Sequence, residues 1–271
     1  MSDSRQKLDK TCAYCESPAN LTREHLWPAA LHDRLMRANK ATGNAFWFRR
    51  INAEIAGEPT IKDVCQKCNN GHLSQLDAYI CALFDRYFAH ILRRYDKVDF
   101  EYKYHLLKRW LLKVCYNSAR LHTSMDLFAY APLLSYINGD SASVGRSVQL
   151  FLQLAYPGVI PPDRLNDSDL QGAPHMWEPQ DNRVGLMRFQ VSAKDRKVLR
   201  AVHLRSYSFY LAFWKPGTTL SITEDFAGEF LLRMPGSVML RASDTNVGLV
   251  CDGADAWRSF DGAREVNLVA S

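Results

Sequence analysis

Four cysteines carry the clearest chemistry in this chain of 271 residues. They form two Cys-x2-Cys pairs, Cys12 with Cys15 and Cys65 with Cys68. Two such pairs supply four thiolates, which is the donor set of a tetrahedral structural zinc site. The sequence therefore predicts one structural Zn²⁺ held by all four cysteines.

Three further polar side chains around these pairs could carry acid–base and metal chemistry. Glu24 and His25 are adjacent between the pairs, and Asn69 directly follows the last cysteine. The imidazole of His25 can accept a proton near neutral pH and activate a water molecule. Glu24 and Asn69 offer hard oxygen donors, which favour Mg²⁺ or Mn²⁺ over softer ions.

The stretches around these residues resemble the HNH endonuclease family in its zinc-framed form. They read Cys-Ala-Tyr-Cys (12–15), Leu-Thr-Arg-Glu-His-Leu-Trp-Pro (21–28) and Val-Cys-Gln-Lys-Cys-Asn-Asn (64–70), followed by Leu73 and Leu76-Asp77. The resemblance covers about a quarter of the chain. It implies a ββα-metal core, in which His25 activates water while Glu24 and Asn69 bind a catalytic Mg²⁺ or Mn²⁺.

The match to the family motif departs from the usual pattern at two positions. The acidic residue before the histidine is Glu24, where Asp is commoner, and the last letter of the motif is Asn69, with Asn70 and His72 as close substitutes. The middle asparagine stays open. Asn44 and Asn52 both lie in the insertion between the two halves of the motif, and neither stands in a clear pattern.

Hydrophobic periodicity predicts the elements that position these residues. Residues 20–25 and 60–64 are expected as two short strands, and apolar side chains at a spacing of three and four predict a helix over 73–95. A second helix over 101–122 would form an antiparallel hairpin with it. Further strands are expected at 148–154, 183–192, 197–205, 206–214, 237–241 and 247–251, with a helix opened by a capping box at Ser221 and Glu224.

These elements predict an α+β fold in three parts. Residues 1–78 would form the zinc-framed ββα-metal core, and residues 79–140 a helical extension. Residues 141–271 would form an accessory domain with a mainly antiparallel sheet. A partner protein or a regulatory ligand is the open alternative for this last part.

The positive charge is concentrated in the first half of the chain. Residues 1–140 carry 20 Lys and Arg against 15 Asp and Glu, whereas residues 141–271 carry 14 of each. An excess of positive charge beside the motif favours a polyanionic partner. The residues expected to contact nucleic acid from the helical hairpin are Arg93, Arg94, Lys108, Arg109 and Lys113.

Composition agrees with an ordinary globular protein, with 47% hydrophobic and 23% charged residues. The amino terminus has no apolar run typical of a signal peptide, and no stretch approaches the length of a membrane span, so the cytoplasm is expected. Together these features predict a metal-dependent endonuclease acting on DNA, with prokaryotic restriction or anti-phage defence as its setting. The alternatives are a non-catalytic zinc-framed module that binds nucleic acid, and an RNase of the same type.

Overall fold

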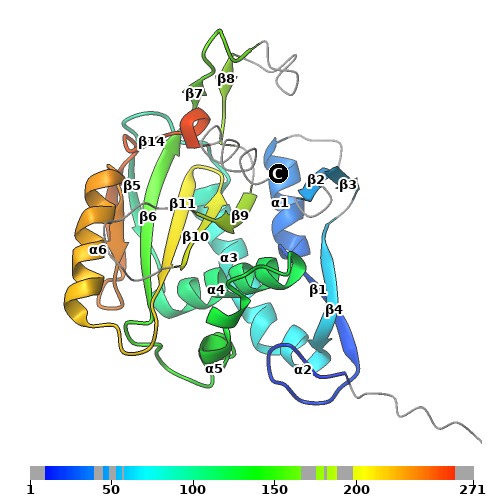
Figure 1. The fold of residues 1–271 in the computed structure, drawn as a ribbon. Coiled ribbons are helices and arrows are strands. Elements are labelled where there is room, and N and C mark those ends of the chain that lie inside the picture. Colours follow the sequence, from blue (N-terminus) through cyan, green and yellow to red (C-terminus); the bar gives the residue numbers. More distant parts are fainter. Residues whose placement is uncertain are drawn as a thin grey trace, which may run out of the picture.

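The computed structural model of the chain is a mixed helix and sheet structure (Figure 1). It describes residues 10–39, 45–48, 53–56, 58–165, 175–179, 182–187 and 198–259. Its sheets are antiparallel except for one short parallel pair, which confirms the predicted α+β class. None of the described helices is long and apolar enough to span a bilayer.

The elements follow one another from the first cysteine pair to residue 259. The helices and helical turns are α1 (Ala29–Asn39), α2 (Gln66–Cys68), η2 (Asn69–Leu73), α3 (Ser74–Leu83), η3 (Phe84–Phe88), α4 (Tyr104–Leu121), η4 (Leu127–Ala129), η5 (Ala131–Leu133), α5 (Leu134–Ile137) and α6 (Leu220–Arg233). The strands are β1 (Leu21–His25), β2 (Ala45–Phe48), β3 (Ala53–Ala56), β4 (Thr60–Cys65), β5 (Lys97–Glu101), β6 (Val148–Tyr156), β7 (Gly158–Val159), β8 (Met176–Trp177), β9 (Asn182–Leu186), β10 (Val198–Leu204), β11 (Tyr207–Phe213), β12 (Val238–Leu240), β13 (Asn246–Val250) and β14 (Ala254–Asp255).

The largest sheet has the strand order β12-β6-β11-β10-β9, with β14 added in parallel to β6. Both faces of its central strands are covered. Leu150 and Leu152 pack into the main core, while Phe151 packs with Phe226 and Phe230 of α6 on the opposite face. The alternation of apolar and polar residues over 148–154 predicts a strand buried on one face only, and this is wrong because α6 covers the second face (Figure 1).

Helix α4 lies at the centre of the molecule, between this sheet and α3. Side chains from Leu107 to Ala119 are buried on all sides of the helix except at Arg109. A helix that is covered all round is part of the core rather than an amphipathic surface element. Its observed bounds agree closely with the predicted helix over 101–122.

The helix predicted over residues 73–95 ends earlier, at Phe88. The Arg205 guanidinium donates hydrogen bonds to the carbonyl oxygens of Phe88 and Ala89, which would otherwise be unpaired at the helix end. The chain then turns into β5, a strand that the sequence analysis missed. Strand β5 pairs with β13, so residues 97–101 lie beside residues 246–250.

The start of α6 also differs from the prediction. The helix begins at Leu220 with Thr219 as its N-cap, and no side chain caps the first turn. The Ser221 hydroxyl instead donates a hydrogen bond to Asp225, 3.4 Å away. The predicted capping box at Ser221 and Glu224 is therefore wrong.

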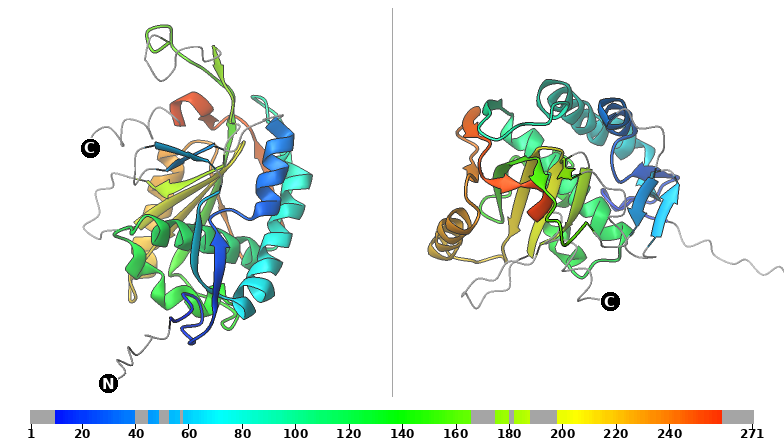
Figure 2. Two further views of the ribbon diagram at one scale, coloured as in Figure 1. Left: turned by 90° about the vertical axis from the view of Figure 1, so that its right-hand side faces the viewer. Right: turned by 90° about the horizontal axis from the view of Figure 1, so that it is seen from above.

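Strands β1 and β4 form a separate antiparallel pair, followed directly by α2, η2 and α3. They lie on the opposite side of the molecule from α6 (Figures 1 and 2). One cluster of buried hydrophobic residues nevertheless includes side chains from all three predicted parts, from Cys12 to Cys251. The domain boundaries predicted after residues 78 and 140 therefore do not separate hydrophobic cores.

Candidate functional site

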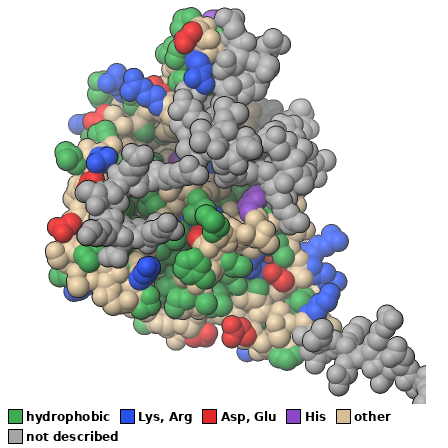
Figure 3. All heavy atoms as spheres, viewed as in Figure 1, with side chains coloured by type: hydrophobic (Ala, Val, Ile, Leu, Met, Phe, Trp, Pro, Cys, Tyr) green, Lys and Arg blue, Asp and Glu red, His purple; other side chains and the backbone are tan. Residues whose placement is uncertain are grey.

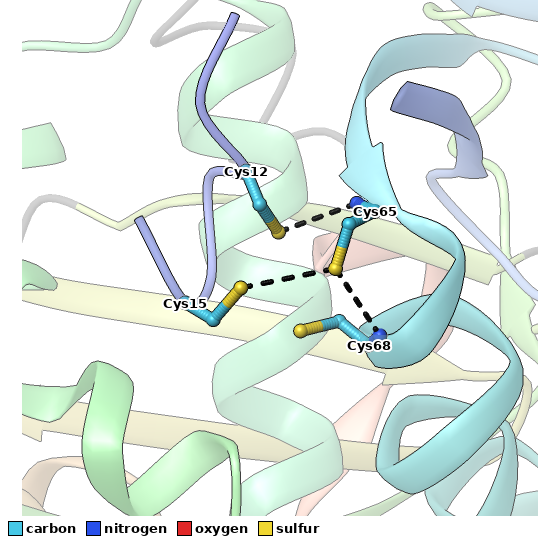
Figure 4. A group of neighbouring side chains, drawn as sticks. All are labelled: Cys12, Cys15, Cys65 and Cys68. Atoms are coloured by element: carbon cyan, nitrogen blue, oxygen red, sulfur yellow. Dashed lines mark hydrogen bonds between the residues drawn. The ribbon is translucent and has the colours of Figure 1, made fainter. Parts of the chain in front are cut away.

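The four predicted cysteines come together at one point (Figure 4). Cys12 and Cys15 lie in the loop before β1, Cys65 ends β4, and Cys68 lies in α2. All four sulfur atoms are within 4.8 Å of one another, and the Sγ atoms of Cys15 and Cys65 are 3.7 Å apart. Zinc–sulfur bonds of about 2.3 Å in a tetrahedron place neighbouring sulfurs about 3.8 Å apart. The cluster therefore has the donor set and the spacing that a structural Zn²⁺ requires.

Backbone amides point at the sulfur atoms of this cluster. The Cys65 amide lies 3.3 Å from the Cys12 Sγ, and the Cys68 amide lies 3.4 Å from the Cys65 Sγ. Burial raises the pKa of the Cys15 thiol, but hydrogen bonds from Ser17 and from neighbouring cysteines outweigh it and bring the pKa to about 6. Burial also raises the pKa of Cys68. A bound cation would favour the thiolate form of these cysteines.

Helix α4 holds the first cysteine loop in place. The Tyr116 hydroxyl donates a hydrogen bond to the Ala13 carbonyl, 2.9 Å away, and the Tyr14 hydroxyl donates to Asn117 Oδ1 at 2.5 Å. The Arg120 guanidinium lies over both tyrosine rings, 5.1 Å from the Tyr14 centroid and 4.5 Å from that of Tyr116. The metal frame is thus packed directly onto the central helix.

His25 stands at the end of β1 with one ring nitrogen engaged and 43% of its side chain exposed. Its Nδ1 lies 2.8 Å from Oε2 of Glu58, whose own side chain is 9% exposed. The hydrogen bond to Glu58 outweighs burial and raises the pKa of His25. A carboxylate at Nδ1 orients a neutral imidazole so that Nε2 can accept a proton.

The sequence analysis missed Glu58. It lies two residues before Thr60, which is the Cα partner of His25 in the antiparallel register. The Leu26 amide donates to the Pro59 carbonyl at 3.0 Å and continues the pairing past the strand end. This register, applied to the two predicted strands, could have placed residue 58 beside His25.

Glu24 points the other way, into the protein. Its Oε1 lies 2.8 Å from Lys113 Nζ, and accepts a hydrogen bond from Asn117 Nδ2 at 3.2 Å. Lys113 Nζ also lies 2.7 Å from each carboxylate oxygen of Asp77. Burial raises the pKa of Asp77, although Lys113 opposes the shift; burial would lower the pKa of Lys113, but the two carboxylates raise it overall. Glu24 and Asp77 therefore share one protein cation, Lys113.

The side chain of Asn69 links η2 to β1. Its Nδ2 donates to the Thr22 hydroxyl at 3.0 Å and to the Arg23 carbonyl at 2.9 Å. The substitute His72 packs its ring against Gly139, where an added Cβ would lie 2.9 Å from the ring, and Asn70 is exposed. Asn44 and Asn52 lie outside the described residues. The roles of all these residues in metal binding stay predictions.

The five basic residues expected to contact nucleic acid do not form one surface. Lys108 and Lys113 are buried, so neither can face a duplex, and this part of the prediction was wrong. Lys108 Nζ donates to the Val148 carbonyl at 2.6 Å, and burial lowers its pKa to about 8. Arg109 is half-buried and donates to the Ser141 carbonyl at 3.0 Å.

Arg93 and Arg94 alone among these five are exposed. Arg93 pairs with Glu178 at 3.1 Å, and Arg94 lies over the rings of Tyr95 and Tyr156. Both are therefore on the surface, as expected, but are engaged with neighbouring side chains.

Comparisons of this chain with protein-family models, with curated proteins and with solved structures gave no match. The function must therefore be argued from the residues and their geometry.

Proposed function

We propose that this chain is an HNH-type endonuclease that hydrolyses phosphodiester bonds in DNA, with a structural Zn²⁺ at the four cysteines. The observation that carries the proposal is the His25 imidazole, which is partly exposed at the end of β1 and held at Nδ1 by Glu58. An imidazole oriented by a carboxylate is suited to remove a proton from an attacking water.

Around His25, strands β1 and β4 and the helical segment after Cys65 have the order that the resemblance implies. Strand β1 ends at His25 and strand β4 ends at Cys65, so the four-cysteine cluster and the imidazole lie at opposite ends of one strand pair. A zinc ion at the cluster would fix the strand pair, and through it the backbone of His25. Rigid placement of the base relative to the bound strand supports catalysis.

A divalent ion is a separate part of the proposal. When bound, Mg²⁺ or Mn²⁺ would neutralise charge on the phosphate and the leaving oxygen. In the arrangement described, Glu24 does not fit as its ligand, because its carboxylate is buried and ion-paired with Lys113, 2.8 Å away. We therefore assign no step to Glu24, and the requirement for Mg²⁺ or Mn²⁺ is to be measured with EDTA as the control.

The deciding experiment compares plasmid cleavage by wild type, His25→Ala and His90→Ala. His90 is an exposed histidine after η3, so its variant controls for the loss of an imidazole at the surface. Losing a positioned base should lower the cleavage rate roughly 10²- to 10⁴-fold. Zinc content and DNA binding should stay near wild type, and an RNA substrate tests for an RNase.

The alternative is a zinc-framed module that binds nucleic acid without cutting it. The burial of Glu24 against Lys113 favours this alternative, since it removes an expected metal ligand from the surface. No cleavage by wild type with either ion would replace the nuclease proposal with this one. Cleavage by His25→Ala at the wild-type rate would instead show that His25 is not the base.

A further inference from the structure

The outer face of strands β1 and β4 carries His25 together with exposed basic side chains. Side chains alternate along a strand, so Glu24 points inward while Arg23 and His25 share the outer face. Across the pair, Arg23 lies directly opposite Lys62, and His25 lies opposite Thr60. Arg23 and Lys62 are therefore neighbours on the same face as the proposed catalytic imidazole.

Two like charges directly opposite each other destabilise an antiparallel pair. Both side chains are exposed, and neither has an acidic partner in the part of the chain that the structure describes. Other surface arginines differ in this respect, since Arg34 pairs with Asp85 and Arg86 pairs with Glu101. The arrangement at β1 and β4 is unfavourable for the free protein, and a polyanion would relieve it.

Positive charge extends along this edge of the molecule. Lys67 of α2 is also exposed and follows β4 directly. In Figure 3, Lys and Arg side chains gather along the flank that β1 and β4 form in Figure 1. Residues Arg23 and His25 are two positions apart on one strand, or about 6.6 Å. One bound strand of nucleic acid can therefore lie over both.

We propose that the outer face of β1 and β4 is the surface that binds DNA, with Arg23 and Lys62 contacting backbone phosphates beside His25. This inference rests on the proposed function and extends it, because it names the surface that receives the substrate. It replaces the helical surface expected from the sequence, where Lys108 and Lys113 proved to be buried.

The test uses the full chain with His25→Ala, so that the labelled duplex stays intact while binding is measured by fluorescence anisotropy. Arg23→Gln with Lys62→Gln should weaken binding roughly ten-fold near 0.1 M salt, and lower the slope of log affinity against log salt by about 2. The matched control is Lys97→Gln with Lys215→Gln, which removes the same charge from two other exposed positions and should change binding little.

A single charge reversal separates binding from folding. Lys62→Glu should raise the melting temperature, because it replaces a repulsive cross-strand pair by an attractive one, yet it should weaken DNA binding more than Lys62→Gln. A structural role for Lys62 predicts the opposite change in melting temperature.

Unchanged affinity and salt slope in the double glutamine variant, or an equal loss in the control, would overturn this surface. Tighter binding to an RNA duplex, with the same loss on substitution, would overturn the assignment to DNA. These binding outcomes are distinct from a failure of the proposed function. The proposed function is decided separately, by plasmid cleavage with wild type and with the single variant His25→Ala.

Discussion

Replacing Lys113 by Met tests the buried charge cluster that links β1, α3 and α4. The Lys113 side chain is 2% exposed and lies within 2.8 Å of both Glu24 and Asp77. The Glu24 side chain is 5% exposed and that of Asp77 is 24% exposed. Removing one partner of a buried ion pair typically costs about 3–5 kcal/mol, because it leaves uncompensated charge. We expect Lys113→Met to lower the free energy of unfolding by this amount near pH 7.

The defect should depend on pH in a definite direction. Burial already raises the pKa of Asp77, and Lys113 is the group that opposes this shift. Without Lys113, the Asp77 carboxylate takes up a proton at higher pH in the folded state than in the unfolded state. A group with a raised carboxyl pKa makes the folded state more stable as pH falls, so the defect should shrink between about pH 7 and pH 5.

Urea unfolding of wild type and variant at these two pH values measures the effect. A matched control combines Lys113→Met with Glu24→Gln and Asp77→Asn, which removes the charges while keeping similar shapes. This neutral variant should recover much of the lost stability, since no buried charge is left unpaired. A Lys113→Met protein as stable as wild type at pH 7, or a defect that grows on acidification, would refute the reasoning.

Three further substitutions test the neighbouring features. Cys65→Ser should reduce bound zinc from about one ion per chain to nearly none in elemental analysis, and retention of the full zinc content would disprove the four-cysteine site. Glu58→Gln should move the acid limb of the pH–rate profile to lower pH. Glu58 raises the pKa of His25, so its loss lowers that pKa and keeps the base neutral in more acidic solution. An acid limb that stays in place would argue that it does not report the titration of His25. Tyr14→Phe removes the hydroxyl that donates to Asn117, and should cost about 1 kcal/mol in urea unfolding with zinc retained; no loss of stability would show that this hydrogen bond has little net effect.

The cysteine site was predictable because its signal is local. The spacing within each Cys-x2-Cys pair fixes two donors, and the two pairs close into one cluster in the fold. The strands β10 and β11 were also predicted within a residue or two at each end. Strand β10 is mainly apolar, with two valines, and strand β11 is rich in aromatic side chains, and both compositions favour strands without knowledge of their partners.

The environment of the charged residues could not be predicted in the same way. Lys108 and Lys113 lie on a helix whose apolar spacing indicates one buried face, but α4 is covered on all sides by the sheet, α3 and β4. A lysine then depends on partners distant in the sequence, such as Asp77 or the Val148 carbonyl. Strand β5 was missed for a similar reason, since its partner β13 lies nearly 150 residues further along the chain.

The pairing of β5 with β13 has a consequence for synthesis on the ribosome. Residues 97–101 emerge long before residues 246–250, so this part of the core stays open until almost the whole described chain has been made. The cysteines that form the metal cluster all lie before residue 69 and can meet much earlier. We expect metal capture to precede completion of the core, and long-range pairing of this kind to be the slow step of folding. The newly made chain would then acquire its mature, fully packed state only near the end of translation.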